Sequence, residues 1–430
     1  MNILNIFPYL FVYFIFFKKT LQSYIIYPFK KSTKEKKEFP EDILQNDLEI
    51  TLEIGTPPQK IDLNLRSQES VFFVTSSKLN LSFTTYNKTN SKSFKNLTNH
   101  ITTFIGKEYK EGIKITESIT INNKENKNIS LIMAISVSCN ESGALGLKLL
   151  DSPQNGIDNC FIYQIKKKAN FDKYSFFIKY DENNDEKGEL IIGSYPHIYD
   201  SKNFKEEEFI YHKVGKINKA INWIYDFDII KYDNIEINNI ITNCIIRIEF
   251  CLIQAPFKLK KFFNDTFFLG KCNETYYSKR EIFIIICDKS LDIKSFKNLS
   301  FILKDIEYQF VLTYKELFIE KDNEYIFGIV FDNYIKNEED SSWIFGKTFM
   351  KKYQLYFDLD RKIIGLYKNN NKRKDEEIKT FNINNIYLLI IIILIIIVII
   401  LIGFIIYLSI NQRKKMAFEL NDDNYDYIPS

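Results

Sequence analysis

The sequence predicts a protein dominated by β-strands, with one transmembrane helix near its C-terminus. From Leu48 onward, short apolar runs alternate with segments rich in Asn, Gly, Asp and Lys, which is typical of strands joined by turns. Long patterns of helical period are rare in this region, and one candidate runs from Asn159 to Lys168. The segment from Ile386 to Ile410 is apolar and carries no charge. At ~1.5 Å per residue it is long enough to cross the ~30 Å hydrocarbon core of a bilayer.

The composition excludes several classes of protein and site. Hydrophobic residues make up 45% of the chain and aromatic residues 16%, which is too apolar for a disordered protein. The formal net charge is +3, so we expect no nucleic-acid partner. The sequence contains 3 histidines and neither a Cys-x-x-Cys motif nor a Cys/His cluster. We therefore expect no metal site and no cofactor.

Apolar segments near both ends of the chain predict its topology. The segment from Ile3 to Phe17 is short for a spanning helix and is typical of the apolar core of a signal peptide, with an uncleaved anchor as the alternative because no basic residue precedes it. Arg413, Lys414 and Lys415 directly follow the C-terminal apolar segment and place the tail in the cytosol. We expect a single-pass, type I membrane protein of the secretory or endomembrane system or the cell surface. Its β-rich part is then lumenal or extracellular.

Strand patterns and charged stretches divide the chain further. The basic stretch from Lys30 to Lys37 predicts a linker or a short pro-like segment, and Lys368 to Lys379 predicts a charged stalk. The alternation of short apolar runs with polar turn residues continues from Tyr211 to Tyr367, so the β-rich part has two halves of comparable pattern. The strands expected in its first half are Leu48–Ile54, Ile61–Leu65, Val71–Val74, Ile113–Ile121, Ser175–Tyr180 and Glu189–Ile192.

The cysteines and the Asn-x-Ser/Thr sequences fit a secretory protein. The 6 cysteines suggest disulfides, although six allow ~15 pairings. We expect Cys272 to pair with Cys287 on neighbouring strands, a bridge worth about 3 kcal/mol in the chain-entropy model. Cys139 with Cys160 is a second candidate, and Cys244 with Cys251 is a weaker one because it would distort the loop between them. Candidate glycosylation sites are Asn80, Asn87, Asn96, Asn128, Asn140, Asn264, Asn273 and Asn298.

Two longer motifs lie at opposite ends of the β-rich part. Leu52 to Gln59 reads as a strand followed by a Gly-Thr-Pro-Pro turn that reverses the chain. Trp343 to Tyr353 reads Trp-Ile-Phe-Gly-Lys-Thr-Phe-Met-Lys-Lys-Tyr. Further segments accompany these motifs in a fixed order, namely Phe104-Ile105-Gly106 with Gly112, Ser142–Leu147, Lys187–Gly193, Trp223, Ile235–Ile240, Tyr356-Phe357-Asp358 and Ile363–Leu366.

In this order and spacing, the segments resemble those of the pepsin-like aspartic peptidases over roughly residues 46–368. The resemblance implies a bilobed, all-β dominated fold, in which Phe104, Ile105 and Gly106 belong to the flap hairpin and Ile105 replaces the family's tyrosine. The expected division is a signal peptide (1–23), a basic linker or pro-like segment (24–45), an N-terminal β lobe (46–205), a C-terminal β lobe (206–368), a charged stalk (369–385), a transmembrane helix (386–410) and a cytoplasmic tail (411–430).

The resemblance places an arginine at each of the family's two catalytic aspartates. The first Asp-Thr-Gly motif falls on Arg66-Ser67-Gln68, followed by Glu69, and the second falls on Arg247-Ile248-Glu249. A shift of the alignment does not bring an aspartate to either position, because Asp62 lies inside the preceding strand and no aspartate lies near the second motif.

These replacements remove the chemistry that the family depends on. Its two carboxylates share one proton, so that one activates water while the other protonates the substrate carbonyl. Arginine has a pKa above ~12 and does neither near neutral pH. The motif glycines, which permit a tight loop, are replaced by Gln68 and Glu249. We therefore expect no catalytic residue at these positions.

Two buried guanidinium groups require an anionic partner, and the sequence leaves two sources open. Glu69 and Glu249 are candidate internal partners of the two arginines. The alternative is a bound acidic ligand, such as an acidic peptide, held in the cleft between the lobes.

Three functions remain open at this level. The first is a membrane-tethered pseudopeptidase that binds a peptide or protein without cutting it. The second is an active aspartic endopeptidase with non-standard catalytic residues, and the third is a structural surface glycoprotein. Sensitivity of any cleavage to pepstatin separates the second from the others, and fold alone does not decide. The ligand and the oligomeric state do not follow from the sequence.

Overall fold

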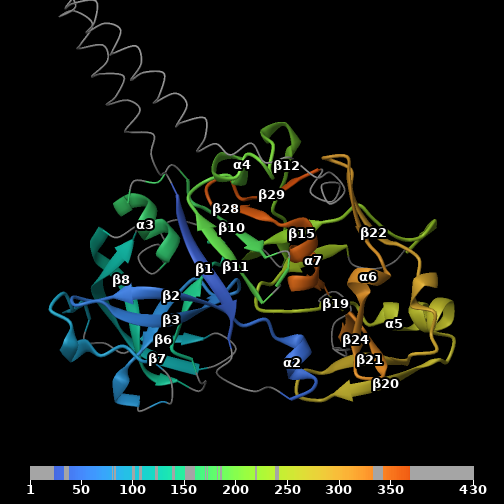
Figure 1. Cartoon of the computed structure of the whole chain (residues 1–430), viewed down its shortest axis with the longest axis horizontal. Helices are drawn as coiled ribbons and strands as arrows, with labels where there is room; N and C mark the ends of the chain where they lie inside the picture. Colours follow the sequence, from blue (N-terminus) through green and yellow to red (C-terminus); the bar gives the residue numbers. More distant parts are fainter. Residues whose placement is uncertain are drawn as a thin grey trace, which may run out of the picture. The chain divides into compact units, whose positions relative to one another are not determined.

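The computed structural model of the chain describes residues 24–368 apart from short internal gaps, the longest of which are 151–159 and 333–341 (Figure 1). The predicted signal peptide, stalk, transmembrane helix and cytoplasmic tail lie outside the described residues. Within the described part of the chain, no helix is long and apolar enough to cross a membrane. The strand-dominated fold that the sequence predicts is confirmed.

The first half of the β-rich part follows the strand prediction closely. All six predicted strands are present, and the predicted helix appears as α3. The elements are the strands β1 Ile25–Lys31, β2 Leu48–Ile54, β3 Gln59–Arg66, β4 Phe72–Thr75, β5 Lys95–Asn96, β6 Thr102–Ile105, β7 Tyr109–Ile121, β8 Lys124–Val137, β9 Gly143–Gly146, β10 Ser175–Tyr180 and β11 Lys187–Ile192, with the helices α2 Glu41–Leu44, α3 Phe161–Ala169 and α4 Pro196–Tyr199.

The N-terminal segment departs from the prediction of a linker. Strand β1 lies between β11 and β2, with Ile25 opposite Ile192 and Phe29 opposite Ile50. Its burial alternates, and Ile25, Tyr27 and Phe29 face the core. The linker prediction is therefore wrong for Ile25–Lys31, because apolar residues at every second position make it a half-buried strand. The pro-like alternative for residues 24–45 stays a prediction.

The second half contains most of the remaining sheets. Its elements are the strands β12 Phe209–Lys213, β13 Lys216–Ile217, β14 Ala220–Ile221, β15 Ile224–Asp226, β16 Ile229–Tyr232, β17 Ile235–Glu236, β18 Asn243–Ile246, β19 Ile253–Ala255, β20 Cys272–Tyr277, β21 Ile282–Asp288, β22 Leu299–Leu303, β23 Tyr308–Leu312, β24 Phe318–Lys321, β25 Glu324–Phe327, β26 Ile329–Asp332, β27 Trp343–Phe345, β28 Tyr356–Asp358 and β29 Ile363–Tyr367, with the helices α5 Lys258–Phe263, α6 Tyr314–Leu317 and α7 Lys347–Tyr353. Strands β12, β28 and β29 return to the first half and extend its sheet beside β10.

The two halves repeat one strand arrangement. In the first half, β3 pairs in parallel with β9, β9 pairs antiparallel with β4, and β4 pairs in parallel with β8. In the second half, β18, β27, β19 and β26 repeat these pairings in the same order and sense. Strand β3 ends at Arg66, and β18 ends at the residue before Arg247. The two arginines therefore occupy equivalent positions in the two halves.

A glycine in each half allows the loop after the arginine to pass close behind it. A Cβ on Gly146 would lie 2.5 Å from the carbonyl oxygen of Glu69, and one on Gly346 would lie 2.2 Å from the carbonyl oxygen of Phe250. These distances are too short for any side chain at either position. The segment Ser142–Leu147, the threading segment, passes behind the first motif loop, where Arg66 pairs in parallel with Gly146.

One apolar core runs beneath both motif loops. Phe176 on β10 stacks on Phe357 on β28, with ring centroids 4.6 Å apart, and both rings contact Trp223. The buried Trp223 donates its indole N–H to the carbonyl oxygen of Leu147 at 2.8 Å. Its own carbonyl oxygen accepts from the backbone N–H of Ile246 at 2.8 Å. Trp223 thus connects the segment that follows β9, the partner of β3, with the end of β18.

The structure confirms one predicted disulfide and contradicts the other two. Cys272 and Cys287 are bonded on the paired strands β20 and β21. Cys160, Cys244 and Cys251 are not disulfide-bonded, so the bridges from Cys160 to Cys139 and from Cys244 to Cys251 are wrong. Cys139 itself lies outside the described residues. Burial raises the pKa of the Cys160 thiol to about 11 and that of Cys244 above its usual value, as expected for thiols enclosed in the core.

The candidate glycosylation sites differ in exposure. Asn96, Asn128, Asn273 and Asn298 are exposed. Asn87 and Asn264 are partly buried, and their side chains hydrogen-bond to Thr89 and Glu274. Asn80 and Asn140 lie outside the described residues. Glycosylation itself stays a prediction, and we expect it first at the exposed asparagines.

Candidate functional site

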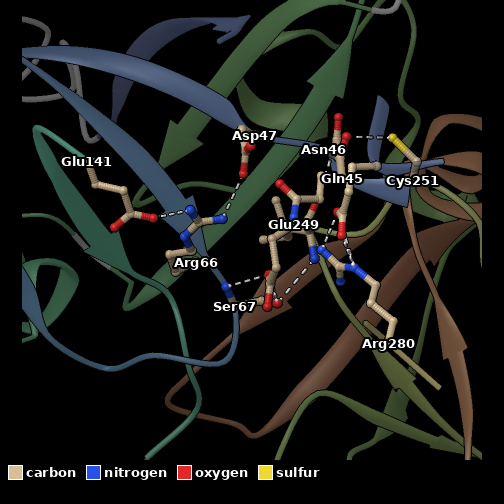
Figure 2. Close-up of polar contacts among 11 residues, drawn as sticks. Gln45, Asn46, Asp47, Arg66, Ser67, Glu141, Glu249, Cys251 and Arg280 are labelled. Atoms are coloured by element: carbon tan, nitrogen blue, oxygen red, sulfur yellow. Dashed lines mark hydrogen bonds and ion pairs between the residues drawn. The ribbon is translucent and has the colours of Figure 1, made fainter. Parts of the chain in front are cut away.

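Arg66 is held at the end of β3 by two carboxylates (Figure 2). Its Nη1 donates to Oδ1 of Asp47 at 3.0 Å, and its Nη2 donates to Oε1 of Glu141. The exposed fractions of the three side chains are 16% for Arg66, 16% for Asp47 and 9% for Glu141. Burial disfavours the charged guanidinium, but Glu141 and Asp47 outweigh it and raise the pKa of Arg66 above its usual value. Arg66 is therefore a charged, internally compensated group.

The two motif loops are joined by Ser67 and Glu249. Oε2 of Glu249 accepts from the backbone N–H of Ser67 at 3.0 Å and from its hydroxyl at 2.7 Å (Figure 2). The Ser67 hydroxyl also accepts from the backbone N–H of Ile248 at 3.1 Å. Glu249 thus fastens the second loop to the first. The predicted pairing of Glu249 with Arg247 is not formed.

The segment before β2 packs against the second motif loop. Asn46 donates its side-chain N–H to the carbonyl oxygen of Ile248 at 2.8 Å, and its backbone N–H to that of Glu249 at 3.1 Å. Further along, Arg280 donates to both carboxylate oxygens of Glu41. Its Nη2 donates to Oε2 at 2.7 Å, and its Nε donates to Oε1 at 3.0 Å and to Oε2 at 3.2 Å. Burial opposes ionisation of Glu41, but Arg280 and Tyr277 lower its pKa to about 2.

Arg247 is in a different state from Arg66. Its backbone N–H donates to the carbonyl oxygen of Phe345 at 2.9 Å, which fixes its position beyond β18. Its Nε is buried without a hydrogen-bond acceptor in the described part of the chain. Burial lowers the pKa of Arg247, Glu249 and Asp332 oppose this effect, and Arg280 adds to it.

The other predicted site residues lie on the same two loops or on the flap hairpin. The Oε1 atom of Gln68 accepts from Asn222 at 2.9 Å, and Glu69 does not pair with Arg66 as the sequence suggested. Phe104 and Ile105 lie on β6, which pairs with β7 as a hairpin where the flap is predicted. Gly106 lies outside the described residues.

Sequence reasoning missed Asp47 and Glu141. The signal for Asp47 was available, because β2 and β3 form a hairpin in which Glu49 lies opposite Asn64. Continuing that register by two residues places Asp47 opposite Arg66. Glu141 directly precedes the threading segment Ser142–Leu147, and nothing in the sequence linked it to the arginine.

Both motif positions carry guanidinium groups. Neither motif position presents a carboxylate, and a proton-sharing pair requires one at each. The carboxylates that do surround Arg66 are Asp47 and Glu141, and both are hydrogen-bonded to it. In the described residues, no group of His, Cys, Asp and Glu is arranged to hold a metal ion.

Comparison with known proteins identifies the β-rich part. Residues 49–369 match the family model described as eukaryotic aspartyl protease. No curated protein matches the chain. The matched region begins within β2 and ends just after β29, so it spans both repeats of the strand arrangement.

Proposed function

Because this chain belongs to the eukaryotic aspartyl protease family, we propose that it is a catalytically inactive, membrane-anchored member that binds a peptide or protein without cleaving it. The observation that carries this proposal is the pair of arginines at the equivalent ends of β3 and β18. An arginine neither takes a proton from water nor donates one to a carbonyl near neutral pH. Arg66 is also tied to Asp47 and Glu141, which leaves it no freedom to act on a substrate.

The proposed location rests on the sequence outside the described residues. The uncharged segment Ile386–Ile410, followed by Arg413, Lys414 and Lys415, supports a single-pass anchor with a cytosolic tail. The disulfide between Cys272 and Cys287 fits an oxidising compartment. The exposed Asn273 and Asn298 support glycosylation of the same part of the chain. We place the β-rich part in the lumen of the secretory or endomembrane system or at the cell surface.

A cleavage assay tests the absence of activity. Purified full-length chain is incubated with an unfolded protein substrate from about pH 2 to pH 8, the range in which carboxylate pairs of this kind titrate. An active pepsin-like peptidase serves as the positive control. We expect no cleavage at any pH, because no proton-sharing pair forms. Turnover that pepstatin inhibits would show that the chain is an enzyme and would overturn the proposal.

A further inference from the structure

The two motif arginines differ in how their charges are balanced. Arg66 forms ion pairs with Asp47 and Glu141. Arg247 forms neither an ion pair nor a side-chain hydrogen bond with any residue that the structure describes, and its Nε is buried without an acceptor. The Nε–H group has lost its contact with water and gained no acceptor in return, which is unfavourable for a buried donor. The site around Arg247 is thus incomplete with respect to negative charge.

The charged neighbours of Arg247 are already engaged elsewhere. The groups that act on it are Glu249, Arg280 and Asp332. Glu249 accepts two hydrogen bonds from Ser67, and Asp332 accepts one from Gln254 at 3.1 Å. Arg280 is held by Glu41 and adds a second positive charge to the surroundings. These contacts hold both carboxylates in place, and neither carboxylate forms an ion pair with Arg247 in the described part of the chain.

The opposite loop carries a second unmatched donor. Nε2 of Gln68 is buried without an acceptor in the described part of the chain, while its Oε1 accepts from Asn222. Asn222 directly precedes Trp223, whose carbonyl oxygen accepts from the residue before Arg247. Gln68 and Arg247 are therefore connected through neighbouring backbone, and both present N–H groups. Both groups lack a hydrogen-bond acceptor, and the positive charge of Arg247 favours an acceptor that is negatively charged.

We infer that Arg247 is the ligand-binding arginine of this site and that it takes a peptide carboxylate, either a C-terminal carboxylate or an Asp or Glu side chain. The inference rests on the proposed peptide-binding function and assigns its chemistry. The planar guanidinium matches a carboxylate through two parallel N–H···O bonds, a geometry that an amide or hydroxyl ligand cannot reproduce. Arg247 as a whole is partly exposed, so its terminal nitrogens are reachable although Nε is enclosed. Arg66 takes no part in binding and serves to hold the first loop.

The test measures binding of short peptides made as matched twins to full-length chain solubilised in mild detergent. One set of twins carries either a free C-terminal carboxylate or an amide, and the other carries either Glu or Gln at an internal position. Wild type is compared with Arg247→Gln, Arg247→Lys and Arg361→Gln. Arg361 is exposed and lies on the turn between β28 and β29, so Arg361→Gln removes the same charge away from the motif loops. Thermal unfolding of each variant confirms that it is folded.

We expect carboxylate twins to bind wild type and Arg361→Gln at least about ten-fold more tightly than their neutral twins, and the difference to fall below about two-fold in Arg247→Gln. Arg247→Lys keeps the charge but not the planar donors and should retain part of the preference. The preference should also weaken with added salt. If the first set shows the preference, the C-terminus supplies the carboxylate. If the second set shows it, an acidic side chain supplies the carboxylate.

Two results would overturn the inference, and they separate it from the proposed function. If both members of each pair bind wild type equally, or if the preference survives in Arg247→Gln, the inference fails while peptide binding stands. If no peptide binds, the proposed function and the inference fail together. Acetate and phosphate, added alone, then serve as probes: stabilisation of wild type but not of Arg247→Gln would mark a site for free anions in place of the peptide site.

Discussion

The ion pairs of Arg66 predict a large stability loss on substitution. Arg66→Gln removes the cation and leaves Asp47 and Glu141 facing each other with exposed side-chain fractions of 16% and 9%. Removal of one member of a buried pair typically costs about 3–5 kcal/mol, because the remaining charge is buried without compensation. For a domain of this size we expect the melting temperature to fall by roughly 5–10 °C. Asp47→Asn should cost less, since Glu141 still balances the guanidinium.

Thermal unfolding of the full-length chain measures this effect against Arg361→Gln, which removes a positive charge from an exposed position. A double-mutant cycle of Arg66→Gln with Asp47→Asn isolates the coupling, which should be at least about 1 kcal/mol for residues in direct contact. If Arg66→Gln lowers the melting temperature no more than Arg361→Gln does, the ion pairs do not hold the first loop, and the contrast drawn between the two arginines loses its basis.

Two other expectations concern topology and acid stability. In sealed microsomes, added protease should remove the tail beyond Arg413 and leave the β-rich part intact, and a protected tail would contradict the predicted orientation. The pKa of Glu41 is lowered from 4.5 to about 2. A lowered pKa stabilises the fold fully above pH 4.5, and this stabilisation is lost as pH falls towards 2. The free energy of unfolding in urea should therefore depend less on pH in this range for Glu41→Gln than for wild type. The control is Glu186→Gln at an exposed position, which should behave as wild type does. Parallel curves for all three proteins would exclude the role assigned to Glu41.

The strands and the arginine positions were predictable because they depend on local patterns. Apolar runs and a Gly-Thr-Pro-Pro turn identify β2 and β3, and the count from Gln59 leads to Arg66. The bridge between Cys272 and Cys287 was also predictable, since both cysteines lie on neighbouring strands. The prediction failed at β1, because Lys30 and Lys31 favoured a basic linker although they end a strand in which Ile25, Tyr27 and Phe29 are buried.

The partners of the arginines were not predictable from proximity in sequence. Glu69 and Glu249 are the nearest acidic residues along the chain, yet neither pairs with its neighbouring arginine. A strand directs successive side chains to opposite faces, and the loops turn sharply, so adjacent residues seldom meet. Asp47 reaches Arg66 across a hairpin, and Glu141 reaches it from the threading segment. Glu249 instead reaches the other lobe, a contact that requires knowledge of how the halves face each other.

The environment of Arg66 also decides what restoring the family residues would do. In the double variant Arg66→Asp, Arg247→Asp, the first new carboxylate would replace the cation that Asp47 and Glu141 now share. Several carboxylates would then be buried together without a counter-charge, and such a group cannot all remain ionised. Glu249 would still be hydrogen-bonded to Ser67, at the position where the resemblance places a glycine. We therefore expect the double variant to be less stable than wild type and to cleave no peptide between about pH 2 and pH 8, where proton-sharing pairs operate.

Thermal unfolding measures the stability of the double variant, and the pepstatin-controlled cleavage assay measures its activity. Pepstatin-sensitive turnover by this variant would mean that the two aspartates suffice, and that the surrounding carboxylates and the altered loops are not a further barrier to catalysis.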